Sequence, residues 1–393
     1  MLAPEINDDN EAGGGRVFDT AVIGGGIVGL CLAWFLAEEG HGVVVIDDGR
    51  HSGTTANAGS LHVQMQSRFM RLYPDLVPGL EAALPLYPLA VEFWRELAGR
   101  LDTNIELNVS GGLMVAESRE QVDFLVAKCE RERALGLDVA MLDRADLERV
   151  APYLGPAIVG AELCVTEGKV NPLLANQAIR HRGLALGVIH RTEERVVDIV
   201  RERAGFRLAT SRGTVTAGRL VIAAGAGTRD LAALVGVTVP AEAEPLHMNV
   251  TEATAPLITH LVQHADRQIT LKQLATGQVV IGGGWPARLV DPDAFPTVDV
   301  ASLVGNVTLA QHVVPRIGRL RLIRTWAGIN TTVDGRSVLG GVSGVPGVTF
   351  AVPGDAGYTL GPLCARIAAD LVIGRKPVVD ATPYTAERFS GRG

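Results

Sequence analysis

The chain has 393 residues, a formal net charge of -7, 47% hydrophobic residues and 20% charged residues. This composition excludes the polar, highly charged class of disordered proteins. The negative charge argues against a broad binding surface for nucleic acids or anionic membranes. Because single cores stop growing at about 250 to 300 residues, we expect one large two-lobed protein or two domains, with small molecules or other proteins as partners.

The first 16 residues are acidic and lack the basic and apolar regions of a signal peptide, so residues 1–16 are expected to be a disordered tail. No apolar run reaches membrane-spanning length, and we expect no membrane span. The cysteines are widely scattered, without a C-x-x-C pair, which argues against a metal site, an iron–sulfur cluster or a disulfide framework in this chain. A reducing cytoplasm is the simplest compartment. The four cysteines are Cys31, Cys129, Cys164 and Cys364.

The first regular elements form a βαβ pattern. Val17 to Ile23 is β-branched and apolar and predicts a strand, and Ile27 to Glu39 predicts a helix with apolar residues on nearly every face. Val43 to Ile46 predicts a second short, continuously apolar strand. Continuous apolar strands joined by a buried helix are typical of a parallel sheet covered on both faces.

The turn inside this unit has the pattern G-x-G-x-x-G at Gly24, Gly26 and Gly29. The first glycine suits a tight turn, the second lets the backbone approach a pyrophosphate, and the third lets helix and strand pack closely. Asp47 follows at about the spacing expected for a carboxylate that accepts a ribose hydroxyl. A glycine-rich turn alone could arise by chance, but strand, helix, second strand and acid in register indicate a dinucleotide site, which NAD or FAD could fill.

The segment from Gly53 to His62 follows the second strand and is dense in small residues and hydroxyls. A nicotinamide enzyme would normally continue into its next helix here. Small residues let the main chain lie flat against a rigid ring, while the hydroxyls of Thr54 and Thr55 can reach a phosphate or the ring edge. The segment favours FAD, although in isolation it could be only a polar turn.

Later segments continue the pattern. Gly168 to Pro172 precedes a helix, strands are predicted over Gly187 to Ile199 and Phe206 to Thr210, and Leu220 to Gly227 is an apolar strand ending in small residues. Trp326 to Asn330 comes next, and Gly354 to Pro362 opens a long final helix. Bare amides at that helix N-terminus suit the electron-rich pyrimidine side of a flavin.

This ordered set resembles the D-amino-acid oxidase and sarcosine oxidase family of FAD enzymes, from Val17 to Phe389. Within the family, Thr55 to Gln64 looks most like the flavin-bearing beta subunits of heteromeric opine (octopine or nopaline) dehydrogenases. Related beta subunits are those of D-hydroxyproline dehydrogenase and hydrogen cyanide synthase. The resemblance implies an α/β fold, with a glutathione-reductase-like FAD-binding Rossmann domain and a second α+β substrate domain built on an antiparallel sheet. It places residues 17–83, 152–236 and 326–389 in the FAD-binding domain and residues 84–151 and 237–325 in the substrate domain.

The resemblance also implies partner subunits, an alpha subunit and a small iron–sulfur subunit, that carry a [2Fe-2S] cluster and often FMN at a subunit interface. Within this chain it implies FAD and a set of contacts drawn from the segments above. These candidate FAD contacts are Gly24, Gly26, Ile27, Val28, Gly29, Asp47, Asp48, Thr54, Thr55, Asn57, Ala58, Gly59, Ser60, Leu61, Val196, Ala224, Gly225, Gly227, Gly328, Gly354, Asp355, Gly357, Tyr358, Thr359 and Leu360.

Periodicity supports a second lobe in two pieces. Apolar residues from Leu86 to Leu97 repeat at helical spacing, and Ser118 to Gln121 is a capping box before another apolar stripe. We interpret both stripes as core and assign Phe93 and Trp94 no chemistry. Strands around His247–Thr251, Gln268–Gln273 and Gln278–Gly282 predict the antiparallel sheet.

The family chemistry is amine oxidation, in which the substrate Cα–H leaves as a hydride to flavin N5 and the imine hydrolyses. A desolvated pocket supplies the neutral amine without a dedicated base, so the protein should supply orientation and charge stabilisation. The candidate catalytic residues are His62 beside the ring, Lys272 from the second-lobe sheet and Tyr358 on the final loop. The alternatives are a packing histidine, a solvent-facing strand lysine and a tyrosine that only wedges against the ring.

Two departures from the family limit this transfer. Asn330 stands where many members have an arginine that clamps the substrate carboxylate, and a neutral amide cannot form that bidentate ion pair. Carboxylate recognition then moves to another residue, such as Arg324 or Lys272, or the substrate is bulkier, as an opine is. Asn330, Arg324 and Gln64 are the candidate substrate contacts. In the final loop, Asp355 replaces a common histidine and Thr359 a glycine.

Three functions remain open. The first is the catalytic flavin subunit of a heteromeric opine or D-amino/imino-acid dehydrogenase. The second is a self-sufficient amino-acid oxidase that produces hydrogen peroxide. The third is a non-catalytic electron-transfer or assembly subunit, which the change at Asn330 keeps open.

Overall fold

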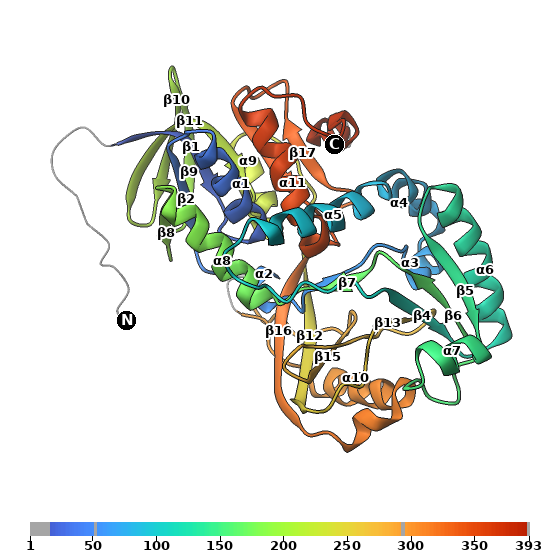
Figure 1. The fold of residues 1–393 in the computed structure, drawn as a ribbon. Helices are drawn as coiled ribbons and strands as arrows, with labels where there is room; N and C mark the ends of the chain where they lie inside the picture. The colour runs from blue at the N-terminus through green and yellow to red at the C-terminus, as the bar shows by residue number, and fades with distance from the viewer. Residues whose placement is uncertain (1–15, 51–52, 292–294, 391–393) are drawn as a thin grey trace.

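Two large sheets organise the chain (Figure 1). The computed structural model describes residues 16–50, 53–291 and 295–390, so the expected tail, apart from Arg16, lies outside the described residues. The predicted βαβ unit is confirmed. Strand β1 (Val17–Ile23), helix α1 (Ile27–Glu38) and strand β2 (Val43–Asp47) follow one another, and the two strands pair in parallel.

The first sheet is mainly parallel at its centre. Strands β18, β11, β1, β2 and β8 pair in parallel, and β17 joins one edge antiparallel to β18. Strands β9 and β10 extend from β11 as an antiparallel meander. The remaining strands of this sheet are β8 (Ile189–Thr192), β9 (Val196–Glu202), β10 (Gly205–Thr210), β11 (Gly213–Ile222), β17 (Val338–Gly341) and β18 (Val348–Val352).

Alternation along the strands divides the core of this lobe into two layers. Val22, Val43 and Val45 face a cluster formed with α1, α8 (Pro172–Ala185) and α11 (Gly357–Val372), which lie side by side in Figure 1. Intervening residues such as Ile23 and Ile46 face a second cluster with the β9–β11 meander and α9 (Thr228–Leu234). The expectation that α1 is apolar on nearly every face is also confirmed, because Ile27 to Leu36 are all buried.

The single strand predicted over Gly187 to Ile199 is wrong. The segment forms two strands with different partners: β8 pairs with β2, and β9 pairs with β10. Between them Glu193 has a positive φ of 54°, a backbone conformation outside the strand region. The chain therefore changes direction at this residue instead of continuing as one strand.

The second sheet runs β16-β12-β15-β14-β13-β4-β6-β5. All of its neighbouring strands pair antiparallel except β13 and β4, which are parallel. The predicted second antiparallel sheet is thus confirmed, with one parallel exception. Its strands are β4 (Gly112–Ala116), β5 (Val139–Asp143), β6 (Gly160–Cys164), β12 (Glu242–Ala253), β13 (Leu261–His264), β14 (Thr270–Gln273), β15 (Gln278–Gly282) and β16 (Leu322–Thr332).

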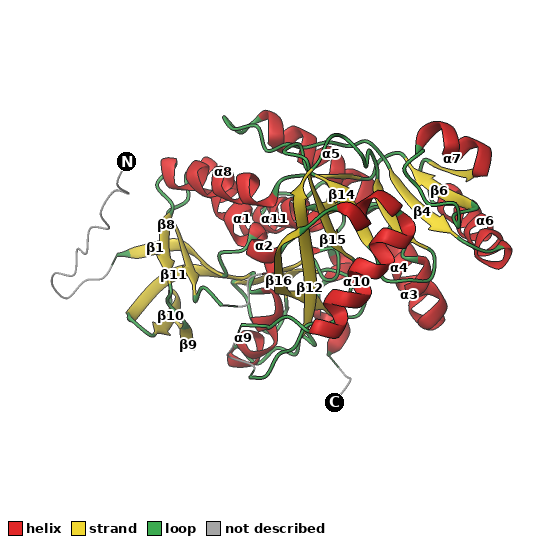
Figure 2. Ribbon diagram, turned by 90° about the horizontal axis from the view of Figure 1, so that it is seen from below, coloured by secondary structure: helices red, strands yellow, loops and turns green. Residues whose placement is uncertain are grey.

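Helix α10 (Val300–Val313) covers one face of this sheet, and Figure 2 shows it in front of β12 and β15. Leu271 and Ile281 pack against Leu309 on that helix side. Because side chains alternate along a strand, the neighbouring Lys272 and Val280 point to the opposite face, where both line the cavity described below.

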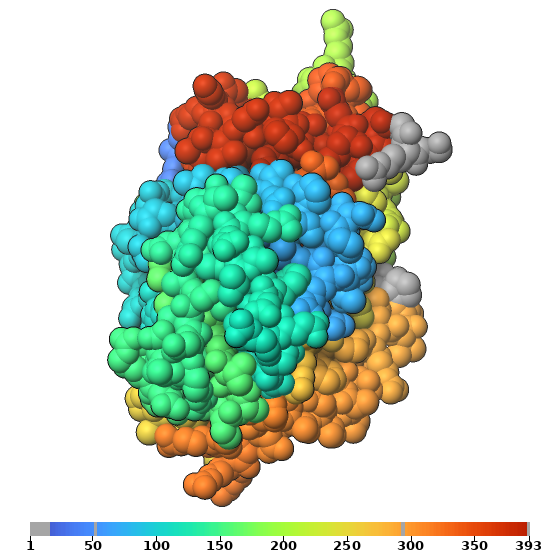
Figure 3. Space-filling view, turned by 90° about the vertical axis from the view of Figure 1, so that its right-hand side faces the viewer, coloured from blue at the N-terminus to red at the C-terminus, as the bar shows by residue number. Residues whose placement is uncertain are grey.

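The segment between the sheets is mostly helical. The space-filling view in Figure 3 shows its blue-to-green residues covering the middle of one face, with C-terminal residues above and residues around 300 below. Ser118 caps α6 by accepting from Gln121 N at 3.3 Å, while the Gln121 side chain accepts from the Glu117 amide at 2.7 Å. The elements are α2 (Gly53–Ala56), β3 (Ser60–Leu61), α3 (Ser67–Leu72), α4 (Val77–Ala83), α5 (Leu86–Gly99), α6 (Arg119–Ala134), α7 (Arg144–Val150) and β7 (Gly168–Lys169).

Several elements cross the expected domain boundaries. Strand β6 follows residue 151 yet joins the second sheet, and β16 crosses the boundary at 325 within the same sheet. Helix α5 follows residue 83 yet packs on α11 through the cluster that contains Trp94 and Leu97. In the described chain, no single helix is long and apolar enough to cross a membrane; one bent pair, Pro74–Ala83 with Leu86–Gly99, passes that test on length and composition together.

Candidate functional site

A cavity of about 850 Å³ extends from the glycine turn after β1 to the inner face of the second sheet. This volume lies toward the upper end of the range typical of ligand pockets. Most of the predicted FAD contacts line it. They are Gly24, Gly26, Ile27, Val28, Asp47, Asp48, Thr54, Asn57, Ala58, Ser60, Val196, Ala224, Gly225, Gly227, Gly328, Gly354, Asp355, Gly357, Tyr358 and Thr359.

The glycine turn has the geometry that its sequence predicted. Gly24 has a φ of 111°, which favours glycine, and a Cβ there would overlap the carbonyl oxygen of Ala223. A Cβ on Gly29 would overlap the carbonyl oxygen of Gly24, so this glycine permits the close packing of α1 on the turn. Gly26 begins α1 without a side-chain cap, and the amide of Ile27 donates to Thr54 Oγ1 at 2.9 Å.

Asp47 sits beside this turn at the end of β2. One carboxylate oxygen accepts from the amide of Gly25, and the other accepts from the amide of Gly49 at 2.6 Å. These bonds hold the carboxylate at the edge of the cavity. An acceptor held there suits a ribose hydroxyl next to a pyrophosphate on the helix N-terminus.

Five predicted FAD contacts are not part of the cavity lining: Gly29, Thr55, Gly59, Leu61 and Leu360. Gly29 acts through helix packing, and a Cβ on Gly59 would overlap the carbonyl oxygen of Val170. Leu61 and Leu360 are core residues with exposed fractions of 0% and 2%. These residues shape the backbone around the site instead of bordering it.

The opposite end of the cavity brings together His62 and Lys272, two of the candidate catalytic residues. Lys272 is fully buried on β14 and donates to Ser60 Oγ at 2.7 Å, so the alternative of a solvent-facing lysine is wrong. Burial and the nearby charge of Lys169 hold the pKa of Lys272 well below its ordinary value. The amide of His62 donates to Thr359 Oγ1 at 3.0 Å, and burial together with Lys272 lowers the pKa of the imidazole to about 4.

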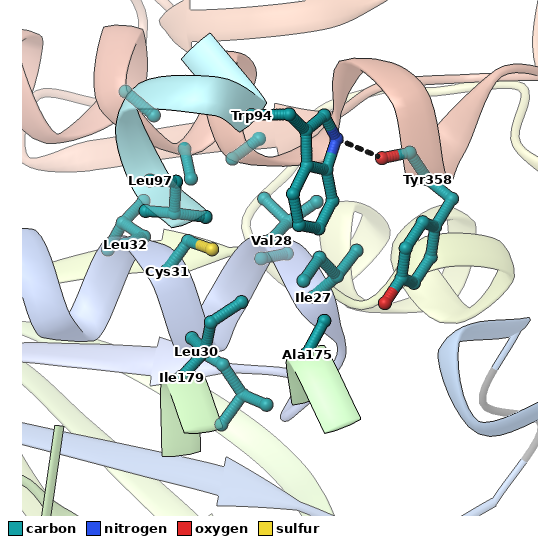
Figure 4. Close-up of a cluster of buried hydrophobic side chains, with 14 of the residues drawn as sticks. Ile27, Val28, Leu30, Cys31, Leu32, Trp94, Leu97, Ala175, Ile179 and Tyr358 are labelled. Atoms are coloured by element: carbon teal, nitrogen blue, oxygen red, sulfur yellow. Dashed lines mark hydrogen bonds between the residues drawn. The ribbon is translucent and has the colours of Figure 1, made fainter. Parts of the chain in front are cut away.

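Tyr358 borders the cavity, but its hydroxyl is engaged elsewhere. The hydroxyl donates to Asn176 Oδ1 at 2.9 Å on α8, and the ring stacks on Trp94 with centroids 5.4 Å apart. Figure 4 shows Trp94 donating from Nε1 to the Tyr358 carbonyl, beside the buried face of α1. This geometry supports the wedge alternative for Tyr358 and gives Trp94, to which the sequence assigned no role, the task of holding the start of α11.

The three candidate substrate contacts separate. Asn330 lines the cavity and donates from Nδ2 to Glu244 Oε2 at 3.0 Å. Arg324 is exposed near the start of β16, lies over the Trp326 ring and does not border the cavity. Because six residues of an extended strand separate Arg324 from Asn330, the two positions lie far apart along β16.

Gln64 is also not a cavity residue. It is buried and donates from Nε2 to Glu167 Oε2 at 2.9 Å, and its carbonyl oxygen accepts from Lys128 Nζ at 3.3 Å. Glu167 further accepts from the amides of Val63 and Gln64 and from Gln263 Nε2. This buried cluster fixes the backbone that follows His62, which is a structural role for Gln64.

Asp355 borders the cavity on the loop before α11. Removal from bulk water and the neighbouring carboxylates of Glu244 and Asp334 raise its pKa to about 6. Asp334 itself pairs with Arg388 at 2.8 Å and with Arg336 at 3.3 Å. Asp355 has no hydrogen bond or ion pair to another described residue.

Sequence reasoning missed several lining residues. Glu194, which is buried and pairs with Arg191 at 2.7 Å, borders the cavity where β8 gives way to β9. The only available signal was a run of charged residues inside an expected strand. Leu246, Met248 and Val280 form an apolar part of the lining on the second sheet. Their alternation along predicted strands marked one face, but nothing in the sequence distinguished the cavity face from the helix-covered face.

The residues present fit FAD. The turn from Gly24 to Gly26 offers backbone amides and no side chains at a helix N-terminus, and Asp47 offers a fixed acceptor beside it. The lining then continues through the small residues Ala56 to Ala58 to the start of α11, which suits an elongated dinucleotide with a flat ring. Among the described residues, no group of three or more potential ligands could hold a metal ion.

Known proteins share this architecture over nearly the whole chain. Glycine oxidase from Geobacillus kaustophilus is 27% identical over 380 residues, covering 95% of this chain and 98% of its own. Its crystal structure superposes with a TM-score of 0.82 at 24% identity, covering 95% and 99% of the two chains. The B-type component of opine oxidase from Rhizobium meliloti is 26% identical, covering 95% of this chain and 98% of its own.

The sarcosine oxidase beta chain from Rhizobium meliloti (strain 1021) is 26% identical over 341 residues, covering 82% of this chain and 76% of its own. The family described as DAO, FAD dependent oxidoreductase, matches residues 19–371. That match spans both sheets and every segment of the cavity lining. The chain therefore belongs to the DAO family and is an FAD-dependent oxidoreductase.

Proposed function

We propose that the chain is the catalytic, FAD-binding subunit of a heteromeric dehydrogenase that oxidises a C–N bond of an amine, with an opine or a D-amino or imino acid as substrate. The observation that carries the proposal is the continuous cavity joining the glycine turn to His62, Lys272 and Asn330. Bound FAD supplies a hydride acceptor at its N5 atom. The imine product then hydrolyses in water.

The protein groups at this end of the cavity are suited to a neutral amine. Leu246, Met248 and Val280 provide apolar surface, and the low pKa of His62 keeps its imidazole uncharged at pH 7. Desolvation disfavours a substrate ammonium ion and so releases the neutral amine that can give up a hydride. Lys272 is placed to orient the reacting groups and to stabilise negative charge through its remaining donors.

A heteromeric assembly is supported by the names of two relatives, which are single components of opine oxidase and of sarcosine oxidase. An alpha subunit and a small iron–sulfur subunit, with FMN at an interface, are the proposed partners. The four cysteines of this chain are buried and free, which is compatible with the proposed cytoplasmic location. A self-sufficient oxidase is the second candidate, because glycine oxidase matches 95% of the chain.

Purification from the native host separates these candidates. We expect the chain to elute with partner subunits and the complex to reduce an artificial electron acceptor when amines are added. A lone chain that generates hydrogen peroxide at the full rate of turnover would establish the self-sufficient oxidase instead.

Anaerobic addition of amino acids, imino acids and opines to the isolated chain tests the catalytic role. Loss of the visible flavin absorbance identifies a substrate. If FAD is bound and nothing bleaches it, while the whole complex turns over the same compounds, this chain serves electron transfer or assembly and the catalytic site lies in a partner.

A further inference from the structure

The charges at the second-sheet end of the cavity point to one class of substrate, and the inference rests on the proposed function. Asp355 is an exposed carboxylate that borders the cavity and has no hydrogen bond or ion pair to another described residue. Glu244 lies close enough to influence it and contacts Asn330, which borders the same space. Asp334 is compensated by two arginines, so Asp355 and Glu244 carry the uncompensated negative charge.

Positive charge is scarce at this end. Among the described residues, the two arginines that line the cavity are Arg50 and Arg195, which belong to the segments after β2 and before β9, next to the dinucleotide end. Lys272 is the cationic residue type on the second-sheet lining, and its Nζ already donates to Ser60. A carboxylate entering here would meet the negative pair without a guanidinium to hold it.

The two departures noted from the family pattern, Asn330 and Asp355, therefore act in the same direction. One removes a positive charge and the other adds a negative charge at the same wall of the cavity. An unpaired carboxylate in a partly desolvated wall gains most from an organic cation with several N–H donors.

We propose that Asp355 recognises a second cationic group of the substrate, a guanidinium or ammonium, remote from the amine that is oxidised. Leu246, Met248 and Val280 offer an apolar wall for the methylene stem that would join the two nitrogen-bearing ends. Asn330 keeps Glu244 in place and presents no competing positive charge. Asp355 is thus a specificity-determining residue that selects dibasic substrates.

Isothermal titration calorimetry on the full FAD-loaded chain tests the proposal without requiring turnover. Arginine and citrulline are the probes, each as both enantiomers, because they have nearly the same shape and differ in one charge. We expect arginine to bind about 10-fold or more tightly than citrulline, the ratio expected for a charge-assisted hydrogen bond. Asp355→Asn should bring the ratio close to one. Asp102→Asn, at an exposed position outside the cavity lining, is the matched control and should leave the ratio unchanged.

Equal binding of the two probes by the unmodified chain would overturn the proposal. So would a preference that survives in Asp355→Asn, or a variant that alters the flavin absorbance spectrum while the arginine preference persists, which would place Asp355 against the flavin. The proposed function fails separately. If no amine bleaches the flavin but arginine is preferred through Asp355, the binding inference stands without the reaction; if neutral amines bleach it and the preference is absent, only the inference fails.

Discussion

The two ends of the cavity are built in different ways. At the dinucleotide end, backbone atoms from one stretch of about 30 residues do the work: a turn through Gly24, the first amides of α1, and Asp47 at the end of β2. At the second-sheet end, side chains from β12, β14, β16 and the loop before α11 meet although they are far apart in the sequence. A site made of local backbone tolerates almost no change of residue type, whereas a site made of distant side chains can change its specificity one residue at a time.

The largest effect is expected at the dinucleotide end. Gly29→Leu should abolish FAD binding and strongly destabilise the first lobe, because even a Cβ at this position overlaps the carbonyl oxygen of Gly24. The ratio of flavin to protein absorbance after purification measures the loss, and circular dichroism reports whether the chain still folds.

A milder pair of variants keeps this prediction testable if Gly29→Leu does not fold. A Cβ on Gly26 would lie 3.0 Å from Thr54 Oγ1, so Gly26→Ala should fold and bind FAD more weakly. Gly99→Ala is the control, since a Cβ there meets nothing within 4 Å. Full flavin content in both glycine-turn variants would mean that close backbone packing does not define this end.

The next effect tests the second-sheet end through Lys272. Lys272→Met should slow anaerobic flavin reduction by about 100-fold, the scale seen when one donor that stabilises developing charge is removed. Its thermal unfolding midpoint should not fall, because a fully buried amine without a carboxylate partner is costly to fold. Stopped-flow absorbance and calorimetry measure the two quantities.

Lys376→Met, at an exposed position, is the matched control and should leave the rate of flavin reduction unchanged. Should Lys272→Met reduce the flavin as fast as the parent chain, Lys272 would have a packing role only, and the second-sheet end would owe its chemistry to other groups.

The same contrast explains which features could be predicted from the sequence. The βαβ unit, its glycine turn and the loop that opens α11 are local, and glycine spacing and apolar periodicity define them. Placing Lys272 against Ser60 was less direct. Alternation put Lys272 on one face of a strand, but only the resemblance to a family suggested that this face meets the flavin segment.

The residues misplaced by sequence reasoning depend on strand direction and burial. Arg324 and Asn330 share one strand, yet extended backbone carries Arg324 away from the cavity. Gln64 is two residues from His62, but the two face different surroundings, because Glu167 pulls Gln64 into a buried cluster. A single sequence does not reveal which polar residue finds a buried partner.

A medium effect should follow from disturbing that buried cluster. Glu167 accepts from two amides and two side-chain amides, and Glu167→Gln replaces one acceptor oxygen by a donor. We expect a loss of about 1–3 kcal/mol in the free energy of unfolding, the cost of leaving a buried donor unsatisfied. Urea unfolding measures it.

Glu202→Gln is the control for Glu167→Gln. Glu202 forms an exposed pair with Arg207 at 2.7 Å, and such pairs contribute at most about 1 kcal/mol. Equal losses in the two variants would show that the cluster behind His62 does not anchor this part of the chain, and that the second-sheet end needs no buried support.

The smallest effect is a pH dependence at Asp355, and it separates charge from shape at the second-sheet end. The pKa of Asp355 is raised to about 6, so its carboxylate is charged above that pH and neutral below it. The groups that act on it are Glu244 on β12, the Asp334–Arg336–Arg388 cluster and Tyr87 on α5. The affinity for arginine should therefore be constant from pH 7 to 8 and fall below pH 6, by at most about tenfold per pH unit, because the guanidinium stays charged throughout. His62 does not produce this change, since its pKa is near 4. Calorimetric titrations between pH 5 and 8 measure the profile, and Asp355→Asn should flatten it. A profile that keeps its slope in the variant would assign the titration to another group and leave the selection of a cationic substrate without its residue.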